Sequence, residues 1–168
     1  MQRLAAYTFG LLKQPWGHPD VAGFVDAAPA IFEKLREADG VLEVRETIHL
    51  TPKWVSESAR PLVASTLTVW RSPEDLFAFT YWAEHGNGYQ KRREWFQEDD
   101  HPGFVLWWLQ DGEEASEREG LRRLELLHDR GPTPEAFTFK APYSPSGEPL
   151  ESVATTRRKT TAGALSPV

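Results

Sequence analysis

The sequence predicts an α+β fold of the ferredoxin-like type, with a β-α-β-β-α-β order that builds one four-stranded antiparallel sheet. Three observations lead to this prediction. Short apolar segments alternate with segments of helical periodicity. The 168 residues suffice for one domain with a core of its own. Seven tryptophans are enough to make the second face of the sheet aromatic, so that a ligand or a second copy would cover it. We therefore expect a homodimeric α+β barrel.

The first half of the chain supplies three strands and one helix. Residues 4–11 are apolar and aromatic and read as the first strand. Residues 21–38 carry apolar side chains at helical spacing, and Pro29 should kink or split this helix. Residues 41–50 form a plausible strand interrupted by charges. Residues 62–70 alternate between two faces and form the strongest strand.

The second half supplies three helical segments and the last strand. Ser72 and Pro73 are an N-cap and a first helical residue, so a helix should run from here to about Glu84. A helical pattern resumes over 89–97. Residues 103–109 are apolar on both faces, which predicts a central strand, and 113–129 form a final helix. The domain should span 1–140, and the Ser-, Thr- and Pro-rich residues 141–168 should be a flexible tail.

Composition excludes several classes of function. The net charge of −6 does not suit a nucleic-acid-binding protein. The absence of cysteine excludes disulfides, thiolate nucleophiles and cysteine metal sites. We see no signal peptide and no transmembrane segment, so we expect a cytoplasmic protein without a membrane partner.

Four segments are similar to one known family. Residues 70–81 (WRSPEDLFAFTY), 92–96 (RREWF), 105–108 (VLWW) and 131–139 (GPTPEAFTF) resemble the family called domain of unknown function 3291, over roughly residues 3–140. The resemblance implies the dimeric α+β barrel superfamily, which includes small antibiotic-biosynthesis monooxygenases, polyketide cyclases and haem-degrading enzymes. In family members, the helix usually continues without a break from the histidine to the arginines. In this sequence, Gly86-Asn87-Gly88 interrupts the helical pattern between His85 and Arg92.

His85 is the foremost catalytic candidate, because histidine titrates near neutral pH and can act as general acid or base. Its place late in the second helix resembles that of the pocket histidine in superfamily relatives. The structural alternative is a histidine that interacts with the last carbonyls of its helix.

Arg92 and Arg93 are candidates for holding a carboxylate, phenolate or enolate oxygen, Arg92 as a catalytic group and Arg93 as a substrate-binding one. Helical neighbours diverge by about 100°, so both cannot face one small site. The alternative is an ion pair with Glu94, Glu98 or Asp99.

Aromatic side chains supply the remaining substrate-binding candidates. Most aromatic residues on strands belong to a core, so we expect only one or two of them to touch a ligand. The candidates are Tyr7, Trp70, Tyr81, Trp95 and Trp107.

We expect no metal site, because the four consecutive residues 98–101 (EDDH) rarely converge on one ion and no second cluster completes them. The leading hypothesis is a cofactor-independent monooxygenase, cyclase or isomerase that acts on a hydrophobic metabolite. The alternatives are a haem-binding or haem-modifying protein with His85 as axial ligand, and a non-catalytic binding module.

Overall fold

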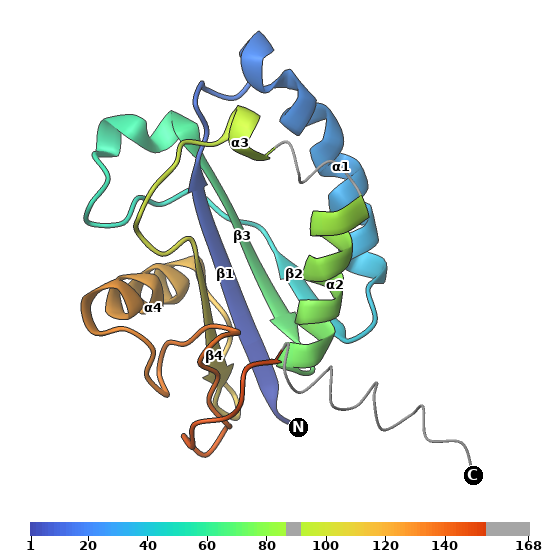
Figure 1. The fold of residues 1–168 in the computed structure, drawn as a ribbon, viewed down its shortest axis with the longest axis vertical. Coiled ribbons are helices and arrows are strands. Elements are labelled where there is room, and N and C mark those ends of the chain that lie inside the picture. The colour runs from blue at the N-terminus through green and yellow to red at the C-terminus, as the bar shows by residue number, and fades with distance from the viewer. Residues whose placement is uncertain (87–91, 154–168) are drawn as a thin grey trace.

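The structure is a computed structural model that describes residues 1–86 and 92–153, with the backbone alone for 82–86. Figure 1 shows a mixed fold of one sheet with helices on both sides. The strands are β1 (Arg3–Leu11), β2 (Val41–Arg45), β3 (Val63–Trp70) and β4 (Phe104–Leu109). The helices are α1 (Ala22–Glu37), α2 (Pro73–Gly86), α3 (Arg92–Trp95) and α4 (Glu117–Arg130), with short 3-10 turns η1 (Pro19–Val21) and η2 (Glu57–Leu62).

The four strands form one antiparallel sheet in the order β2-β3-β1-β4. The predicted four-stranded antiparallel sheet is thereby confirmed. β4, however, lies at an edge of the sheet and not at its centre. It is apolar on both faces because both are covered, and its outer edge pairs with the chain at Phe137 through a bridge to Leu106.

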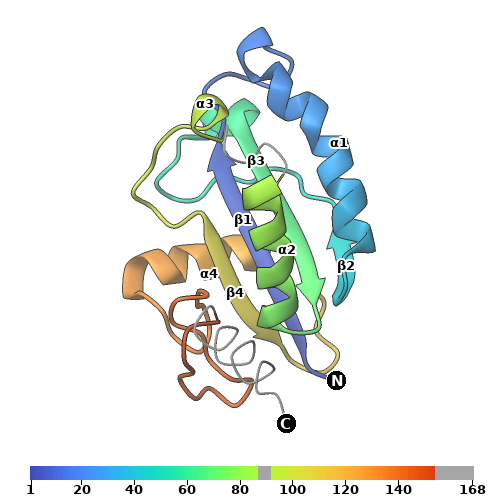
Figure 2. The ribbon, with the colours of Figure 1, turned by 45° about the vertical axis from the view of Figure 1, so that its right-hand side comes forward.

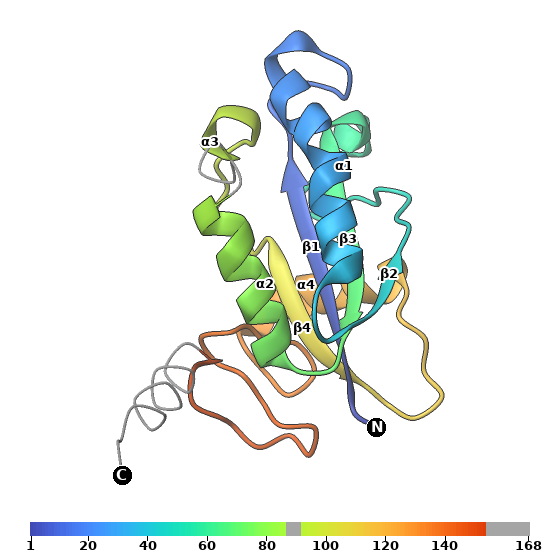
Figure 3. The same cartoon turned by 90° about the vertical axis from the view of Figure 1, so that its right-hand side faces the viewer.

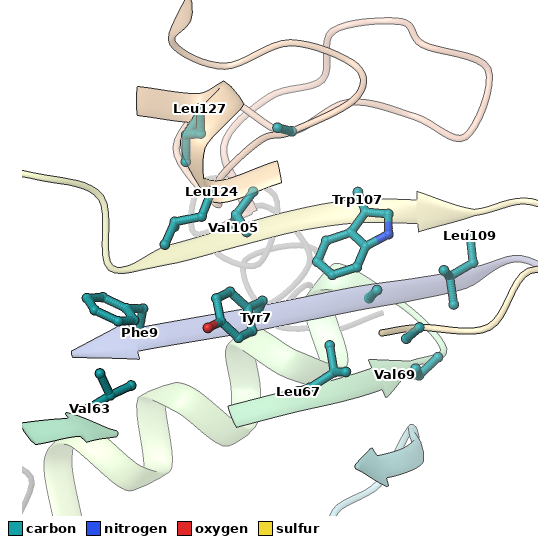
Figure 4. Packing of buried hydrophobic residues seen from close by; sticks show 13 residues of the cluster. Tyr7, Phe9, Val63, Leu67, Val69, Val105, Trp107, Leu109, Leu124 and Leu127 are labelled. Atoms are coloured by element: carbon teal, nitrogen blue, oxygen red, sulfur yellow. The ribbon is translucent and has the colours of Figure 1, made fainter. Parts of the chain in front are cut away.

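Helices cover both faces of the sheet. α1 and α2 lie on one face, called here the α1/α2 face, and α4 lies on the other, the α4 face (Figures 1 and 3). We predicted that this second face would be open to a ligand or a second copy. Instead, Leu124 and Leu127 of α4 pack onto it, in one cluster with the fully buried Tyr7 and Trp107 (Figure 4).

The helix boundaries follow their capping residues. The Ser72 hydroxyl accepts a hydrogen bond from the Asp75 N–H (3.2 Å) and fixes the start of α2. Ser116 does the same for α4 through the Glu119 N–H (3.2 Å). Pro29 does not split α1, which is one helix of 16 residues. Its ring lies on the exposed side, while Leu35 on the opposite side packs into the core.

The packed part of the chain extends beyond Lys140, where we expected the tail to begin. Val153 is 2 % exposed and its N–H donates to Phe139 O (3.1 Å). The Trp108 Nε1–H donates to Tyr143 O (2.8 Å). Residues 154–168 of the predicted tail lie outside the described residues. Within the described ranges, no helix is long and apolar enough to span a membrane.

Candidate functional site

The α1/α2 face divides into a packed half and a partly exposed half. Around Trp70 and Leu4, large apolar side chains from the strands and from both helices pack into one cluster. Toward the other end of β1 and β3, the same face presents small residues that remain partly exposed: Thr8, Gly10, Ala64 and Thr66. We call Thr8, Gly10, Ala64 and Thr66 the floor. Their exposure is unusual, because residues of central strands under a layer of helices are normally buried.

The floor carries a pair of hydroxyl groups. Thr8 and Thr66 lie directly opposite each other on β1 and β3, and their Oγ1 atoms are 2.5 Å apart. One hydroxyl donates to the other, so the pair still offers a proton and lone pairs to a third group. Both side chains are partly exposed and can therefore accept a ligand.

Arg92 lies at the end of the floor where β1 stops. Its guanidinium carbon is 5.2 Å from the centre of the Phe96 ring, one turn further on in the chain. A Cβ atom added to Gly10 would lie 3.8 Å from Arg92 Nη2 and only 2.8 Å from the Phe96 ring. Glycine at position 10 therefore lets Arg92 and Phe96 approach the floor closely, which brings the Arg92 guanidinium to the Gly10 end of the floor.

An aromatic wall stands beside Arg92. Phe24 of α1 contacts Phe96 edge to face, with ring centres 5.1 Å apart, and Trp95 at 6.0 Å. Trp16 lies 5.3 Å from Phe24 on the other side. An apolar wall next to a cation and two hydroxyls suits a flat apolar ligand with an anionic oxygen.

His85 belongs to α2 by its backbone, but its side chain lies outside the described residues. The helix ends at Gly86, and a separate helix begins at Arg92. The predicted interruption at Gly86-Asn87-Gly88 falls largely on residues 87–91, which are also outside the described ranges. α2 runs along the α1/α2 face toward α3, so its last turn and Arg92 lie at the same end of the fold (Figure 3).

The structure brings one further predicted site residue close to Arg92 and separates the others from it. Trp95 lies beside Arg92, on Gly23 of α1. Arg93 is exposed, and its backbone carbonyl accepts a hydrogen bond from Lys13 Nζ (2.6 Å). Tyr81 is 50 % exposed on α2, 6.5 Å from the ring of Phe77.

Three predicted substrate-binding residues are fully buried. Trp70 lies in the packed half of the α1/α2 face, where its indole N–H donates to Thr68 Oγ1 (2.8 Å). Tyr7 and Trp107 point to the α4 face (Figure 4). These two side chains therefore face away from Arg92 and do not share a site with it.

A second polar cluster lies under α4. The Glu117 carboxylate accepts hydrogen bonds from the N–H of Ile48 (2.5 Å) and Leu50 (3.0 Å) and from the Ser65 hydroxyl (3.3 Å). Ser65 also contacts His49 Nδ1 (3.1 Å). The Tyr7 hydroxyl lies near Ser65 and Glu117 but has no hydrogen bond of acceptable geometry. Burial, and then the Glu117 charge, raise the pKa of Tyr7.

This second cluster holds the fold together and is largely buried. Glu117 and Ser65 are each 8 % exposed, and Tyr7 is fully buried. The carboxylate ties the 48–50 segment to the first turn of α4, a position that favours negative charge. His49 joins this cluster because Ser65 of β3 lies between its ring and the Glu117 carboxylate of α4.

A third group of titratable side chains lies at the far end of α4. The rings of Trp54 and His101 stack with centres 4.7 Å apart, and His128 lies 4.9 Å from His101. His101 also bonds to Asp99. In the part of the chain that the structure describes, no group of three or more His, Cys, Asp or Glu side chains could hold a metal ion.

The floor was missed by sequence reasoning. Thr8 and Thr66 read as ordinary strand residues, and only the register of β1 against β3 places them side by side. A usable signal was present in the strand 63–70, where threonine alternates with apolar residues although both faces are covered. Polar residues on the covered face of a central strand point to a wet or functional region.

Comparisons with known proteins identify the family of the chain but do not indicate an activity. A family model described as domain of unknown function (DUF3291) matches residues 3–153. No curated protein matches the sequence. Among solved structures, the chain is similar to protein SO0527 from Shewanella oneidensis, with 12% identity over 64% of this chain and 89% of that one, at a TM-score of 0.38.

Proposed function

Because the chain belongs to the family of domain of unknown function 3291, whose description names no reaction, we propose a function from the site itself. The protein binds a flat, hydrophobic metabolite that carries an ionisable oxygen, and it moves a proton on that metabolite. The ligand lies on the floor between α1 and α2. The observation that carries the proposal is the partly exposed hydroxyl pair Thr8–Thr66, with Oγ1 atoms 2.5 Å apart, in a position where a packed core would be expected.

Each group of the site has a part in binding. The Arg92 guanidinium neutralises the anionic oxygen, which a planar fork of donors suits well. Thr8 or Thr66 donates a second hydrogen bond to the same oxygen or to a neighbouring carbonyl. Phe24, Phe96 and Trp95 contact the apolar body of the ligand.

The reaction class in this proposal is a proton transfer without a cofactor, as in an isomerisation or a cyclisation. His85 takes a proton from a carbon next to a carbonyl, and Arg92 stabilises the enolate that forms. The histidine then returns the proton at another position, so the ligand is neither oxidised nor reduced. Monooxygenation uses the same enolate with molecular oxygen as the oxidant: a CH2 group of the ligand becomes a carbonyl that holds one oxygen atom, and the other oxygen atom leaves as water with the two hydrogens.

The proposal also includes the ferredoxin-like class and a homodimer. The class is supported by the element order and by the strand order β2-β3-β1-β4, with α1 and α2 on one face. A barrel formed from two sheets would require contact through the α4 face, which α4 already covers. Haem binding with His85 as axial ligand stays a prediction that the described residues do not test.

A ligand titration tests the binding half of the proposal. The probe is 1-hydroxy-2-naphthoate, and its methyl ester serves as the uncharged analogue. We expect the acid to bind more tightly than the ester, and Arg92→Ala to remove about 1–3 kcal/mol of binding free energy for the acid alone. Arg93→Ala is the matched control and should leave both affinities unchanged. Equal losses in the two arginine variants would contradict the proposal.

Turnover tests the catalytic half separately. His85→Ala should retain affinity for the naphthoate and lose proton exchange at the carbons next to the carbonyl of a second probe, 2-tetralone, measured by NMR in deuterium oxide. A folded His85→Ala variant that exchanges at the wild-type rate would remove the histidine from the mechanism. Binding without exchange in the wild-type protein would reduce the function to ligand binding.

A further inference from the structure

We infer that the outer edge of β2 is the surface through which two copies of this chain associate, with their β2 strands paired antiparallel to join the two sheets. The inference specifies the homodimer proposed above and does not depend on the ligand. It rests on the free edge of β2, on the direction of its backbone groups and on its pattern of charges.

The two edges of the sheet differ. The outer edge of β4 is paired with the segment at Phe137, where Leu106 and Phe137 exchange backbone hydrogen bonds of 2.8 and 2.9 Å. Within residues 1–86 and 92–153, β2 pairs with β3 alone. β2 lies at the outside of the sheet beside the C-terminal end of α1 (Figure 2). An edge with unsatisfied N–H and C=O groups is a template for another strand.

The backbone of β2 is oriented for such pairing. The Leu12 N–H donates to Leu62 O (2.8 Å), so even-numbered residues of β1 and β3 bond to each other. Odd-numbered residues of β3 therefore bond toward β2, where their partners are Glu43 and Arg45. The backbone N–H and C=O groups of successive residues point to opposite edges of a strand, so those of Val44 point away from β3.

The charges of β2 select a second copy as the occupant. In an antiparallel pair centred on Val44, each Glu43 lies opposite Arg45 of the other copy, on the α4 face. A pair centred on Glu43 would oppose two carboxylates, and one centred on Arg45 would oppose two guanidinium groups. Opposite charges in directly facing positions stabilise a strand pair, and like charges destabilise it.

Both charged side chains are accessible for this contact. Glu43 and Arg45 are 31% and 34% exposed and already bond to each other within the chain at 2.7 Å. In the dimer, two such pairs form a square of alternating charge. A shallow groove of about 270 Å³ follows the same edge, lined by Arg36 of α1 and by residues 41–44. Leu42, 38% exposed on this edge, loses water contact when a strand occupies it.

Single-cysteine variants test the register, because the chain contains no cysteine of its own. Directly opposed residues have Cα atoms about 5.5 Å apart, within the range of roughly 4.4–6.8 Å that a disulfide bridges. Val44→Cys should therefore cross-link to itself under mild oxidation, as seen on a non-reducing gel. Leu42→Cys alone and Glu46→Cys alone should not cross-link, because in this register each residue lies four positions, or about 13 Å along the strand, from its own copy in the partner.

Charge reversal tests the same contact without cysteine. Glu43→Arg and Arg45→Glu should each weaken the dimer at least tenfold in sedimentation velocity, and the double variant should regain most of that loss. Circular dichroism checks that each variant is folded.

Three results would overturn the inference. A wild-type dimer with no Val44→Cys cross-link would place the interface elsewhere, and equal cross-linking by Leu42→Cys alone would refute the register. A wild-type monomer at all concentrations would refute this surface together with the proposed homodimer. Naphthoate binding should be the same in Val44→Cys and wild type, so failure at this edge remains separate from failure of the ligand site.

Discussion

At the scale of single residues, the buried polar groups divide between those that hold the fold and those left accessible to a ligand. Glu117 is buried and accepts three hydrogen bonds, whereas Thr8 and Thr66 bond to each other and remain partly exposed. Placing a polar side chain under a helix layer costs free energy unless it serves the fold or a ligand. Because the Thr8–Thr66 pair holds no other element in place in the described part of the chain, we assign it to ligand binding.

Glu117→Ala should lower the free energy of unfolding by about 2–3 kcal/mol, because it leaves the N–H groups of Ile48 and Leu50 without their charged acceptor. Urea unfolding followed by circular dichroism measures the loss. Glu114→Ala is the control, since Glu114 is 79 % exposed and makes one ion pair at 3.7 Å. We expect the control to change stability by less than about 0.5 kcal/mol. Equal effects in both variants would refute the structural role of Glu117.

Tyr7→Phe should change stability by less than about 1 kcal/mol and should not weaken binding of the naphthoate, because the Tyr7 hydroxyl lacks a hydrogen bond of acceptable geometry and faces away from the floor. Unfolding and ligand titration of the same variant measure both effects. A large loss of affinity with unchanged stability would return Tyr7 to the ligand site.

At the scale of elements, the ranges of most strands and helices follow from the sequence, but their neighbours do not. Alternation in 63–70 and the Ser72–Pro73 cap were sufficient to place β3 and α2. The position of β4 at an edge was not predictable from its apolar residues, because both its faces are covered by segments distant in sequence. The same holds for α4, whose cover of the second face removed the open surface that the tryptophans suggested.

Gly120→Ala should destabilise the protein by about 1–3 kcal/mol, although alanine is favoured over glycine in a helix by about 1 kcal/mol. A Cβ at position 120 would lie 2.8 Å from the Tyr7 ring, so α4 would have to move away from the sheet. Thermal unfolding measures the change. The double variant Tyr7→Leu with Gly120→Ala should lose less than the sum of the single variants, and strict additivity would contradict the close packing.

Acid sensitivity should depend on α4 through Glu119. Hydrogen bonds from Arg122, then from Arg123, lower the pKa of this carboxyl to about 2 against the opposing effect of burial. Because the pKa is lower in the folded state than the ordinary value of 4.5, the ionised carboxyl stabilises the folded protein above pH 4.5. This contribution to stability is lost as the pH falls toward 2. Because the side chain is 34% exposed, the contribution should be about 1 kcal/mol or less. Glu119→Gln should therefore lose stability at pH 6 and differ little from wild type near pH 2, and an equal difference at both pH values would contradict this.

At the scale of the whole molecule, the two faces of the sheet differ in how completely they are packed. The α4 face is a sealed core around Tyr7 and Trp107, and the α1/α2 face is packed only near Trp70. The family and the α+β character were accessible from sequence, as was Arg92 as a site residue to be tested. The floor was not, because it exists only where the β1 and β3 register brings Thr8 and Thr66 together.

Methyl NMR of the wild-type protein during a titration with 1-hydroxy-2-naphthoate tests the central claim most directly. The threonine methyl signals of Thr8 and Thr66 should shift in a saturable manner, while those of Leu124 and Val69 on the α4 face should remain in place. Saturable shifts on the α4 face, with Thr8 and Thr66 unaffected, would contradict the assignment of the ligand site to the α1/α2 face.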